Sequence, residues 1–313
     1  MLSFLLLAAA VFPEPFVPSD NPMSAAKVEL GRHLFYDKRL SGNGQQSCAS
    51  CHRQELAFTD GLARAKGSTG EVHPRSSMSL ANVGFYPSLT WVKPGEVTRL
   101  EQQALVPMLG TNPVELGTRE AELLRALRED TVYQRLFTAA FPGEGAVSLE
   151  NVTKAIAAFE RTLVSTNSPY DRYRYGGEAD AISAAAKRGE VVFFSSRKAG
   201  CFQCHGGWNL GGPVQYQGQK QEPRRERVRT PSLRNIAVTA PYLHDGSVAT
   251  LEALVEGYAA GTLREHLAKE DALLRPLPGL TAQDKADLVE FLKSLTDEGF
   301  LRDARFADPW RTR

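Results

Sequence analysis

Two short stretches of the sequence decide the fold: "SCASCHRQ" at residues 47–54 and "GCFQCHGG" at residues 200–207. Each places two cysteines three positions apart and follows the second with a histidine. Two thiols at this spacing can add to the two vinyl groups of one haem, and the histidine then reaches the iron from the proximal side. The pattern predicts two covalent c-type haems. The attachment residues are Cys48, Cys51 and His52 for the first haem, and Cys201, Cys204 and His205 for the second.

Two other uses of paired cysteines fit these stretches less well. A zinc site would need both pairs brought together and would leave the two histidines unexplained. A redox dithiol requires no histidine at that position in both copies. All four cysteines of the chain lie in the two units, so none remains for a structural disulfide.

The bulk composition is that of a soluble globular protein with one large or two ordinary domains. Of the 313 residues, 42% are hydrophobic and 23% are charged. Lys+Arg 37 against Asp+Glu 36 leaves a net charge of +1, so no bulk field favours nucleic acid or an anionic membrane. The one cationic cluster, "PRRERVR" at 223–229, fits a solvated loop. We therefore expect no nucleic-acid partner.

The N-terminus resembles an export signal. Leu2 to Phe12 is an apolar run too short to span a bilayer, and Ala8 and Ala10 offer a small-x-small cleavage site, although no Lys or Arg precedes the run. We expect residues 1–18 to be a leader. Because no second long apolar run follows, we expect no membrane span in the mature chain.

The rest of the chain predicts an all-α fold in two related halves with long loops. The stretch "STNSPYDRYRYGG" at 165–177 interrupts the helical periodicity with Ser, Pro and Gly, which is typical of a linker. We expect domains at 19–165 and 166–313. The main helical patterns lie at 24–35, 119–130, 148–164, 181–194, 250–261 and 281–295.

The ligand opposite each proximal histidine decides between an electron carrier and an enzyme, because an open iron can bind peroxide or oxygen. No methionine follows Cys201, which excludes a methionine ligand from within the second half. Periodicity alone favours Tyr258 as a core residue on an apolar helix face, although that face of a haem-domain helix is also the one that meets the haem. The candidates for the second haem are His244, His266, Tyr216, Tyr242 and Tyr258.

For the first haem, "LEQQALVPMLGTNPVELG" at 100–117 supplies Gln102, Gln103 and Glu115. A carboxylate beside an open iron could act as general base on bound peroxide and then as acid on its distal oxygen. The residues alone do not separate this role for Glu115 from that of an exposed glutamate near a turn.

Longer motifs resemble the bacterial di-haem cytochrome c peroxidase/MauG superfamily, from about residue 27 to the C-terminus. They are "ELGRHLFYDKRLSGNGQQSCASCHRQELAFTDG", "RSSMSLANV", "RTPSLRNIAVTAPYLHDGSVATLEALVEGY" and "LVEFLKSLT". The resemblance implies two cytochrome c-like helical domains with one c haem each, a calcium ion between them and a periplasmic location. The first domain would hold a high-spin, peroxide-reacting haem and the second a low-spin haem.

The resemblance also assigns roles to individual residues. Glu115 matches the distal glutamate, Gln103 and Pro107 match its pocket neighbours, and Trp91 resembles the tryptophan that relays electrons between the haems. The implied calcium ligands are the side chain of Asn82 and the backbone carbonyls of Thr239 and Pro241, oxygen donors of the kind that calcium prefers.

Tyr258 stands where ordinary peroxidases of the superfamily have methionine and MauG-like members have tyrosine. The motifs look closest to MbnH-type enzymes, which oxidise a tryptophan of a copper-binding periplasmic partner (MbnP-like) towards kynurenine. Ala199 is small where MauG presents a surface tryptophan, which disfavours a methylamine dehydrogenase precursor as the partner. The resemblance thus implies that hydrogen peroxide is consumed and a partner protein oxidised through a high-valent di-haem state.

Two alternatives remain open from the sequence. One is a peroxidase that reduces hydrogen peroxide with electrons from a small cytochrome or cupredoxin, and the other is a plain di-haem electron carrier. His73 in "GEVHPR" lies near the place where some peroxidases keep a displaceable histidine on the first haem. If His73 binds iron at rest, the enzyme needs reductive activation, whereas a loop histidine leaves the ferric enzyme ready, as we expect from Tyr258.

Overall fold

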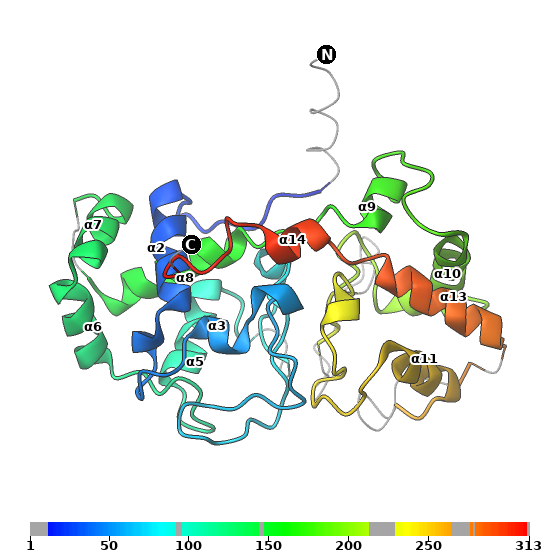
Figure 1. The fold of residues 1–313 in the computed structure, drawn as a ribbon, viewed down its shortest axis with the longest axis horizontal. Helices are drawn as coiled ribbons and strands as arrows, with labels where there is room; N and C mark the ends of the chain where they lie inside the picture. The colour runs from blue at the N-terminus through cyan, green and yellow to red at the C-terminus, as the bar shows by residue number, and fades with distance from the viewer. Residues whose placement is uncertain are drawn as a thin grey trace, which may run out of the picture.

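The structure, a computed structural model, describes residues 12–91, 96–143, 147–212, 229–263, 276–277 and 279–311. Within these residues the chain forms helices joined by long loops, with isolated β-bridges and no strand. Figure 1 shows two helical lobes side by side. This confirms the predicted all-α fold. Most of the predicted leader and nearly all of the cationic stretch lie outside the described residues.

The helices divide between the lobes along the chain. The first lobe contains α2 (Ala25–Tyr36), η1 (Lys38–Leu40), α3 (Cys48–Cys51), η2 (Gln54–Leu56), η3 (Val83–Phe85), α4 (Leu100–Gln103), α5 (Leu105–Leu109), α6 (Glu120–Glu129), α7 (Thr131–Ala140) and α8 (Leu149–Arg161). The second contains α9 (Pro169–Arg174), α10 (Ala184–Phe194), η4 (Cys201–Gln203), η5 (Ile236–Val238), α11 (Leu251–Ala260) and α13 (Ala282–Lys293). The last helix is α14 (Glu298–Arg302).

The predicted linker contains a helix of its own, α9. The Ser168 side chain accepts a hydrogen bond from the backbone N–H of Asp171, and Pro169 occupies the first helical turn, where its missing N–H is not needed. The Ser and Pro taken as signs of a break therefore start a short helix. Within the predicted linker, only Tyr175, Gly176 and Gly177 follow it, outside the helix.

Both lobes are built around a close crossing of two helices. A Cβ atom on Gly31 of α2 would overlap the backbone carbonyl of Ala155 in α8, and one on Gly189 of α10 would overlap that of Asp287 in α13. The two glycines thus allow the same close packing in each lobe, around clusters of buried apolar side chains. This repeat supports the prediction of two related halves.

Replacing Gly189 by alanine tests this crossing. Alanine is the better helix former by about 1 kcal/mol, but the added methyl meets backbone that cannot rotate away, and overpacking costs typically 1–3 kcal/mol. We expect Gly189→Ala to lower the free energy of unfolding, measured by chemical denaturation of the haem-loaded protein. Gly279→Ala is the control because a Cβ there meets nothing within 4 Å. Equal stability of the two variants would contradict this account.

The two ends of the chain cross between the lobes. Phe300, Leu301 and Phe306 are buried in a cluster with first-lobe residues such as Phe35 and Phe58, and Figure 1 shows the C-terminus lying over the first lobe. At the other end, the Phe12 ring meets those of Tyr175 and Trp208 in the second lobe. The structure therefore departs from the domain boundary set at 165/166. Residues 298–311 pack with the first lobe because their apolar side chains are buried there.

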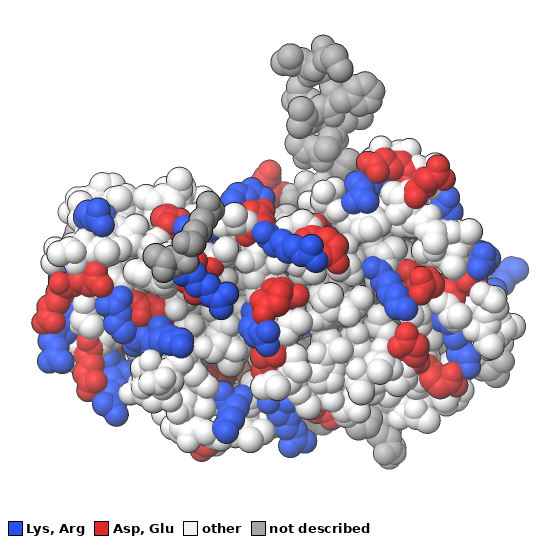
Figure 2. All heavy atoms as spheres, in the orientation of Figure 1, with Lys and Arg blue, Asp and Glu red and all other residues white. Residues whose placement is uncertain are grey.

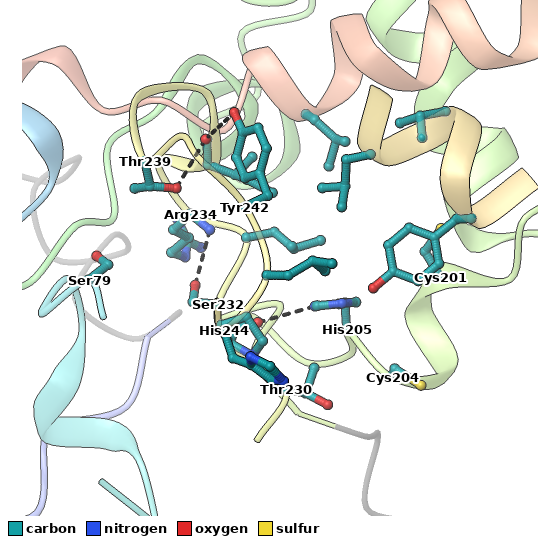
Figure 3. Close-up of a pocket in the computed structure, with 18 of the residues that line it drawn as sticks. Ser79, Cys201, Cys204, His205, Thr230, Ser232, Arg234, Thr239, Tyr242 and His244 are labelled. Carbon is teal, nitrogen blue, oxygen red and sulfur yellow. Dashed lines mark hydrogen bonds between the residues drawn. The ribbon is translucent and has the colours of Figure 1, made fainter. Parts of the chain in front are cut away.

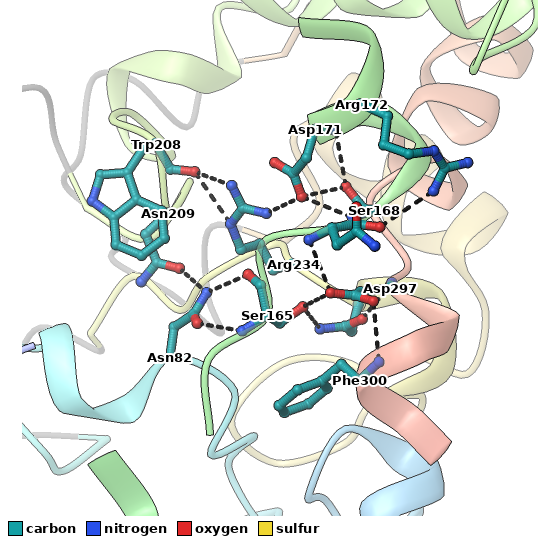
Figure 4. A network of polar contacts seen from close by, with 12 residues as sticks. Asn82, Ser165, Ser168, Asp171, Arg172, Trp208, Asn209, Arg234, Asp297 and Phe300 are labelled. Atoms are coloured by element: carbon teal, nitrogen blue, oxygen red, sulfur yellow. Dashed lines mark hydrogen bonds and ion pairs between the residues drawn. The ribbon is translucent and has the colours of Figure 1, made fainter. Parts of the chain in front are cut away.

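A buried polar network joins the lobes (Figure 4). The Asn82 amide donates to the carbonyl of Ser165 and accepts from its N–H, at 3.0 and 2.8 Å. The Asn235 amide donates to the Ser165 hydroxyl at 2.9 Å and accepts from the N–H of Asp297 at 2.8 Å. Asn82 and Asn235 both have left-handed backbone and no exposed surface. Equivalent asparagines from the two halves therefore hold the same crossover segment.

Charged side chains of both signs are interspersed over the two lobes on the face shown in Figure 2. This agrees with the near-neutral composition. In the described part of the chain, no helix is long and apolar enough to cross a membrane.

Candidate functional site

The first cysteine pair lies on the single turn of α3. The backbone N–H of His52 bonds to the carbonyl of Cys48 at 2.9 Å, and the His52 Nδ1 lies 2.8 Å from the carbonyl oxygen of Phe58. Ala57 and Phe58 both have left-handed backbone, which turns that carbonyl back towards the ring. With Nδ1–H donated to a carbonyl, the lone pair of Nε2 is free to bind a metal.

The second pair repeats this arrangement on a 3₁₀ turn. The backbone N–H of His205 bonds to Cys201 at 2.8 Å, and its Nδ1 lies 3.1 Å from the carbonyl oxygen of Pro231 and 3.3 Å from that of Leu210. Burial lowers the pKa of His205 to about 4 and also lowers the pKa of His52. Both imidazoles are therefore neutral near pH 7, which is the state that binds iron.

The alternative uses of the cysteines find no support in this geometry. Among the described residues, no three or more His, Cys, Asp and Glu side chains gather as a metal site. The two pairs lie in different lobes, so they do not form the single zinc site that the alternative required.

A cavity of about 410 Å³ opens beside the second pair, between the lobes. Figure 3 shows its wall, with Cys201, Cys204 and His205 from the second lobe and Ser79 from the first. Tyr258 of α11 lines the same cavity, and burial together with the nearby Cys201 and Cys204 raises the pKa of its phenol. A large apolar cavity with a histidine, two thiols and a phenol fits a haem.

The other candidate ligands of the second haem are placed differently. Tyr242 also lines the cavity, but its hydroxyl donates to the carbonyl of Ile236 at 3.1 Å. His244 lies on the wall, and its carbonyl accepts from the N–H of Ser76 at 2.8 Å. Tyr216 and His266 are outside the described residues. Of these candidates, Tyr258 would best serve as a second ligand of a haem bound in this cavity, which remains a prediction.

A buried arginine in the cavity wall provides a further test of the haem assignment. The guanidinium of Arg229 stacks 3.9 Å above the Tyr86 ring and donates to the carbonyl of Ser88 at 2.8 Å, while its Nε is buried without a hydrogen-bond partner. Burial lowers the pKa of Arg229. A buried cation calls for an anion, and haem propionates are anionic. Arg229 is the last residue of the cationic stretch 223–229, for which the sequence favours a solvated loop, although an arginine there could also pair with a carboxylate ligand.

Trp91 comes from the first lobe, yet it lies in the wall of the cavity beside Cys201 and Cys204. Its indole N–H donates to the carbonyl of Ser76 at 2.9 Å, and its own carbonyl accepts from the N–H of Arg229 at 2.8 Å. Two residues after Ser76, the backbone of Met78 interacts with the His52 ring. The loop 76–79 thus links the proximal side of the first site to Trp91. In the sequence, this loop stands out only as part of the family motif "RSSMSLANV".

Glu115 belongs to the first site. Its charge acts on Cys48, Cys51 and His52. Its Oε1 lies 3.4 Å from Nε2 of His73, so the structure brings these two predicted residues together. Gln103 and Pro107 lie one helical turn apart on α4 and α5, and the Pro107 carbonyl accepts from the N–H of Leu116 beside Glu115 at 2.8 Å. Gln102, by contrast, is exposed.

The three expected calcium ligands come from both lobes, Asn82 from the first and Thr239 and Pro241 from the second. Thr239 and Pro241 line the cavity, whereas the Asn82 amide oxygen accepts from Ser165 and its nitrogen donates to Ser165 and Asn209. Calcium stays an expectation from the resemblance alone.

Comparisons with known proteins agree with this site. Residues 25–180 match the family model described as di-haem cytochrome c peroxidase. The chain is 33% identical to the methylamine utilization protein MauG of Methylophilus methylotrophus, over 91% of this chain and 86% of that protein. The chain belongs to the di-haem cytochrome c peroxidase/MauG family.

Two other relatives place it further within the family. It is 33% identical to cytochrome c peroxidase Ccp of Escherichia coli strain K12, over 89% of this chain and 60% of that protein. A crystal structure of a MauG-like protein associated with microbial copper homeostasis matches with a TM-score of 0.86 and 41% identity, covering 96% of this chain and 98% of that one. This member of the family is thus a peroxide-dependent oxidoreductase of the MauG-like branch, with two c haems.

The role of Arg229 can be tested by redox titration. A buried cation favours the reduced haem because reduction lowers the net positive charge of the iron. We expect Arg229→Met to lower the reduction potential of the second haem and to leave that of the first almost unchanged. Arg302→Met, at an exposed site on α14, is the control. If Arg229→Met has the same reduction potentials as the unmodified protein, the assignment of Arg229 to the haem site is wrong.

Proposed function

We propose that the protein uses hydrogen peroxide to oxidise a partner protein by long-range electron transfer through its two haems. The observation that carries the proposal is the position of Trp91, which comes from the first lobe and lines the cavity of the second. When bound, the two haems would supply irons that can exchange electrons, and the first would supply a site for peroxide. The surrounding residues determine how these irons are used.

At the first site, His52 would hold the iron from the proximal side and Glu115 would act on the peroxide. The carboxylate can accept a proton from the oxygen nearer the iron and return it to the distal oxygen, which leaves as water. Burial lowers the pKa of His52 and so favours its neutral state, and the hydrogen bond from Nδ1 to the Phe58 carbonyl leaves Nε2 free, which fits the ligand role. Gln103 and Pro107 would shape the pocket around the peroxide.

At the second site, Tyr258 would complete the coordination of the iron together with His205. An oxygen ligand favours oxidised iron, whereas a methionine ligand raises the potential. This suits a haem that stores oxidising equivalents, and Trp91 would share these equivalents between the two sites.

We further propose that the oxidised group is a tryptophan of a copper-binding periplasmic partner, converted towards kynurenine. Support comes from the similarity to a MauG-like protein associated with copper homeostasis. Oxidation of tryptophan to N-formylkynurenine removes four electrons and adds two oxygen atoms, so two molecules of peroxide are consumed and two of water released. Hydrolysis then releases formate. Export through the leader at 1–18 and a structural calcium ion belong to this proposal as expectations.

The relatives named cytochrome c peroxidase favour a second candidate, a peroxidase supplied with electrons by a small cytochrome or cupredoxin. Incubating the ferric holoenzyme with peroxide and the purified partner, followed by mass spectrometry of the partner, separates the two. Oxygen incorporated at a partner tryptophan supports our proposal. Peroxide turnover that requires a reduced cytochrome or cupredoxin, with an unchanged partner, supports the peroxidase.

Replacing Glu115 by glutamine should slow the reaction with peroxide by about 10²- to 10⁴-fold, the usual contribution of a general acid–base group. The measurement is stopped-flow absorption of the ferric enzyme. Glu122→Gln, which removes an exposed carboxylate on α6 of the same lobe, controls for the loss of charge. An unchanged rate for Glu115→Gln would exclude its catalytic role.

Replacing Tyr258 by methionine should raise the reduction potential of the second haem, because a His/Met pair has a higher potential. The absorption and electron paramagnetic resonance spectra of the low-spin haem should change as well. Tyr242→Phe is the matched control, since that hydroxyl is bonded to Ile236. If only the control alters the low-spin spectrum, Tyr258 is a packing residue and not the ligand.

A further inference from the structure

His73 has an unusual place in the first site. Its ring lies between two partners: Nδ1 accepts a hydrogen bond from the backbone N–H of Arg75 at 3.2 Å, and Nε2 lies 3.4 Å from Oε1 of Glu115. Because Nδ1 is an acceptor, the proton of the neutral ring is on Nε2, the atom that faces the carboxylate. In this arrangement both ring nitrogens of His73 have a protein partner.

The loop that carries His73 is a rigid support. Residues 65–75 fold back on themselves, with the N–H of Ala65 bonded to the carbonyl of Arg75 at 3.1 Å and the N–H of His73 bonded to that of Ala65 at 2.7 Å. An isolated β-bridge between Lys66 and Val72 closes the same turn. The backbone beside His73 is therefore held on both sides.

This hairpin is also fastened to the segment that bears Glu115. The N–H of Ser68 donates to the Glu115 carbonyl at 2.7 Å, and the N–H of Val114 donates to the Glu71 carboxylate at 3.0 Å. A Cβ on Gly67 would overlap the carbonyl of Val114, so only glycine permits this approach. These contacts fix the backbone of both segments and leave the contact with His73 to orient the Glu115 side chain.

We propose that His73 is a positioning residue for Glu115: its Nε2–H holds the carboxylate in the orientation that acts on peroxide. The contact of 3.4 Å is long for a hydrogen bond, as is common before substrate binds, and it would shorten when peroxide occupies the site. The inference rests on the proposed function, since it assumes that Glu115 acts on peroxide. It assigns His73 a role other than iron ligand.

The experiment compares the ferric holoenzyme with His73→Ala, His73→Gln, Glu115→Gln and the double variant His73→Ala/Glu115→Gln. Stopped-flow absorption gives the rate with peroxide, and electron paramagnetic resonance gives the coordination of the first haem. We expect His73→Ala to slow the reaction about 10- to 100-fold, as loss of a supporting hydrogen bond does in other metal sites. His73→Gln, which keeps an N–H donor, should recover most of that rate.

The double variant tests whether His73 acts through Glu115. If it does, adding His73→Ala to Glu115→Gln slows the reaction little further, whereas independent roles would multiply the two losses. The spectrum of the first haem should stay the same in His73→Ala. A change from a low-spin to a high-spin first haem would show that His73 is an iron ligand at rest, and would overturn the proposal.

The chain offers a matched control in His33, whose Nδ1 lies 3.3 Å from Glu29 on α2. His33→Ala removes a histidine from a comparable His–Glu contact and should leave the peroxide rate unchanged. An unchanged or faster rate in His73→Ala, with the unmodified enzyme active, contradicts the positioning role alone. Failure of the unmodified ferric enzyme to react with peroxide contradicts the proposed function itself.

Discussion

The structure depends on the fixed junction between its two lobes. Asn82 and Asn235, one from each half, bind the same segment at Ser165, and nearby Arg234 forms an ion pair of 2.7 Å with Asp171. Both partners of this ion pair are almost fully buried, at 1% and 3% side-chain exposure, so loss of either would leave an unpaired buried charge. Electron sharing between two sites requires a constant separation, and this network provides it.

The same junction explains why residues of one lobe serve the site of the other. Trp91 and the loop 76–79 belong to the first lobe, yet they form part of the cavity beside His205. Since Ser76 binds both the indole of Trp91 and the loop of His244, a shift of one lobe would disturb the cavity wall. The second haem site is thus complete only in the assembled two-lobe protein.

The two proximal sites are alike, so the proposed difference between the haems would come from the opposite side. His52 and His205 each direct Nδ1 at a backbone carbonyl and each is neutral. Beyond them, the second site offers the phenol of Tyr258 and the first offers the Glu115 carboxylate supported by His73. One repeated fold can therefore hold a closed iron and an open one.

Much of this could be predicted from the sequence, because the CxxCH units are local and the long helices have clear apolar periodicity. Thr281 does cap α13, and Gly261 ends α11. The contact of His73 with Glu115 and the placement of Arg229 could not be predicted from the sequence, because each brings together residues that are far apart in the chain. The return of Phe300 and Phe306 to the first lobe was missed for the same reason: periodicity shows that a side chain is buried, but not against which partner.

The most direct test of the central claim, that two unlike haems share oxidising equivalents across the junction, is spectroscopic. Optical absorption and electron paramagnetic resonance of the fully ferric protein would be recorded before and after one equivalent of peroxide. The account predicts one high-spin and one low-spin haem, whose signals are lost together without prior reduction. Two low-spin haems that ignore peroxide until one is reduced would contradict it.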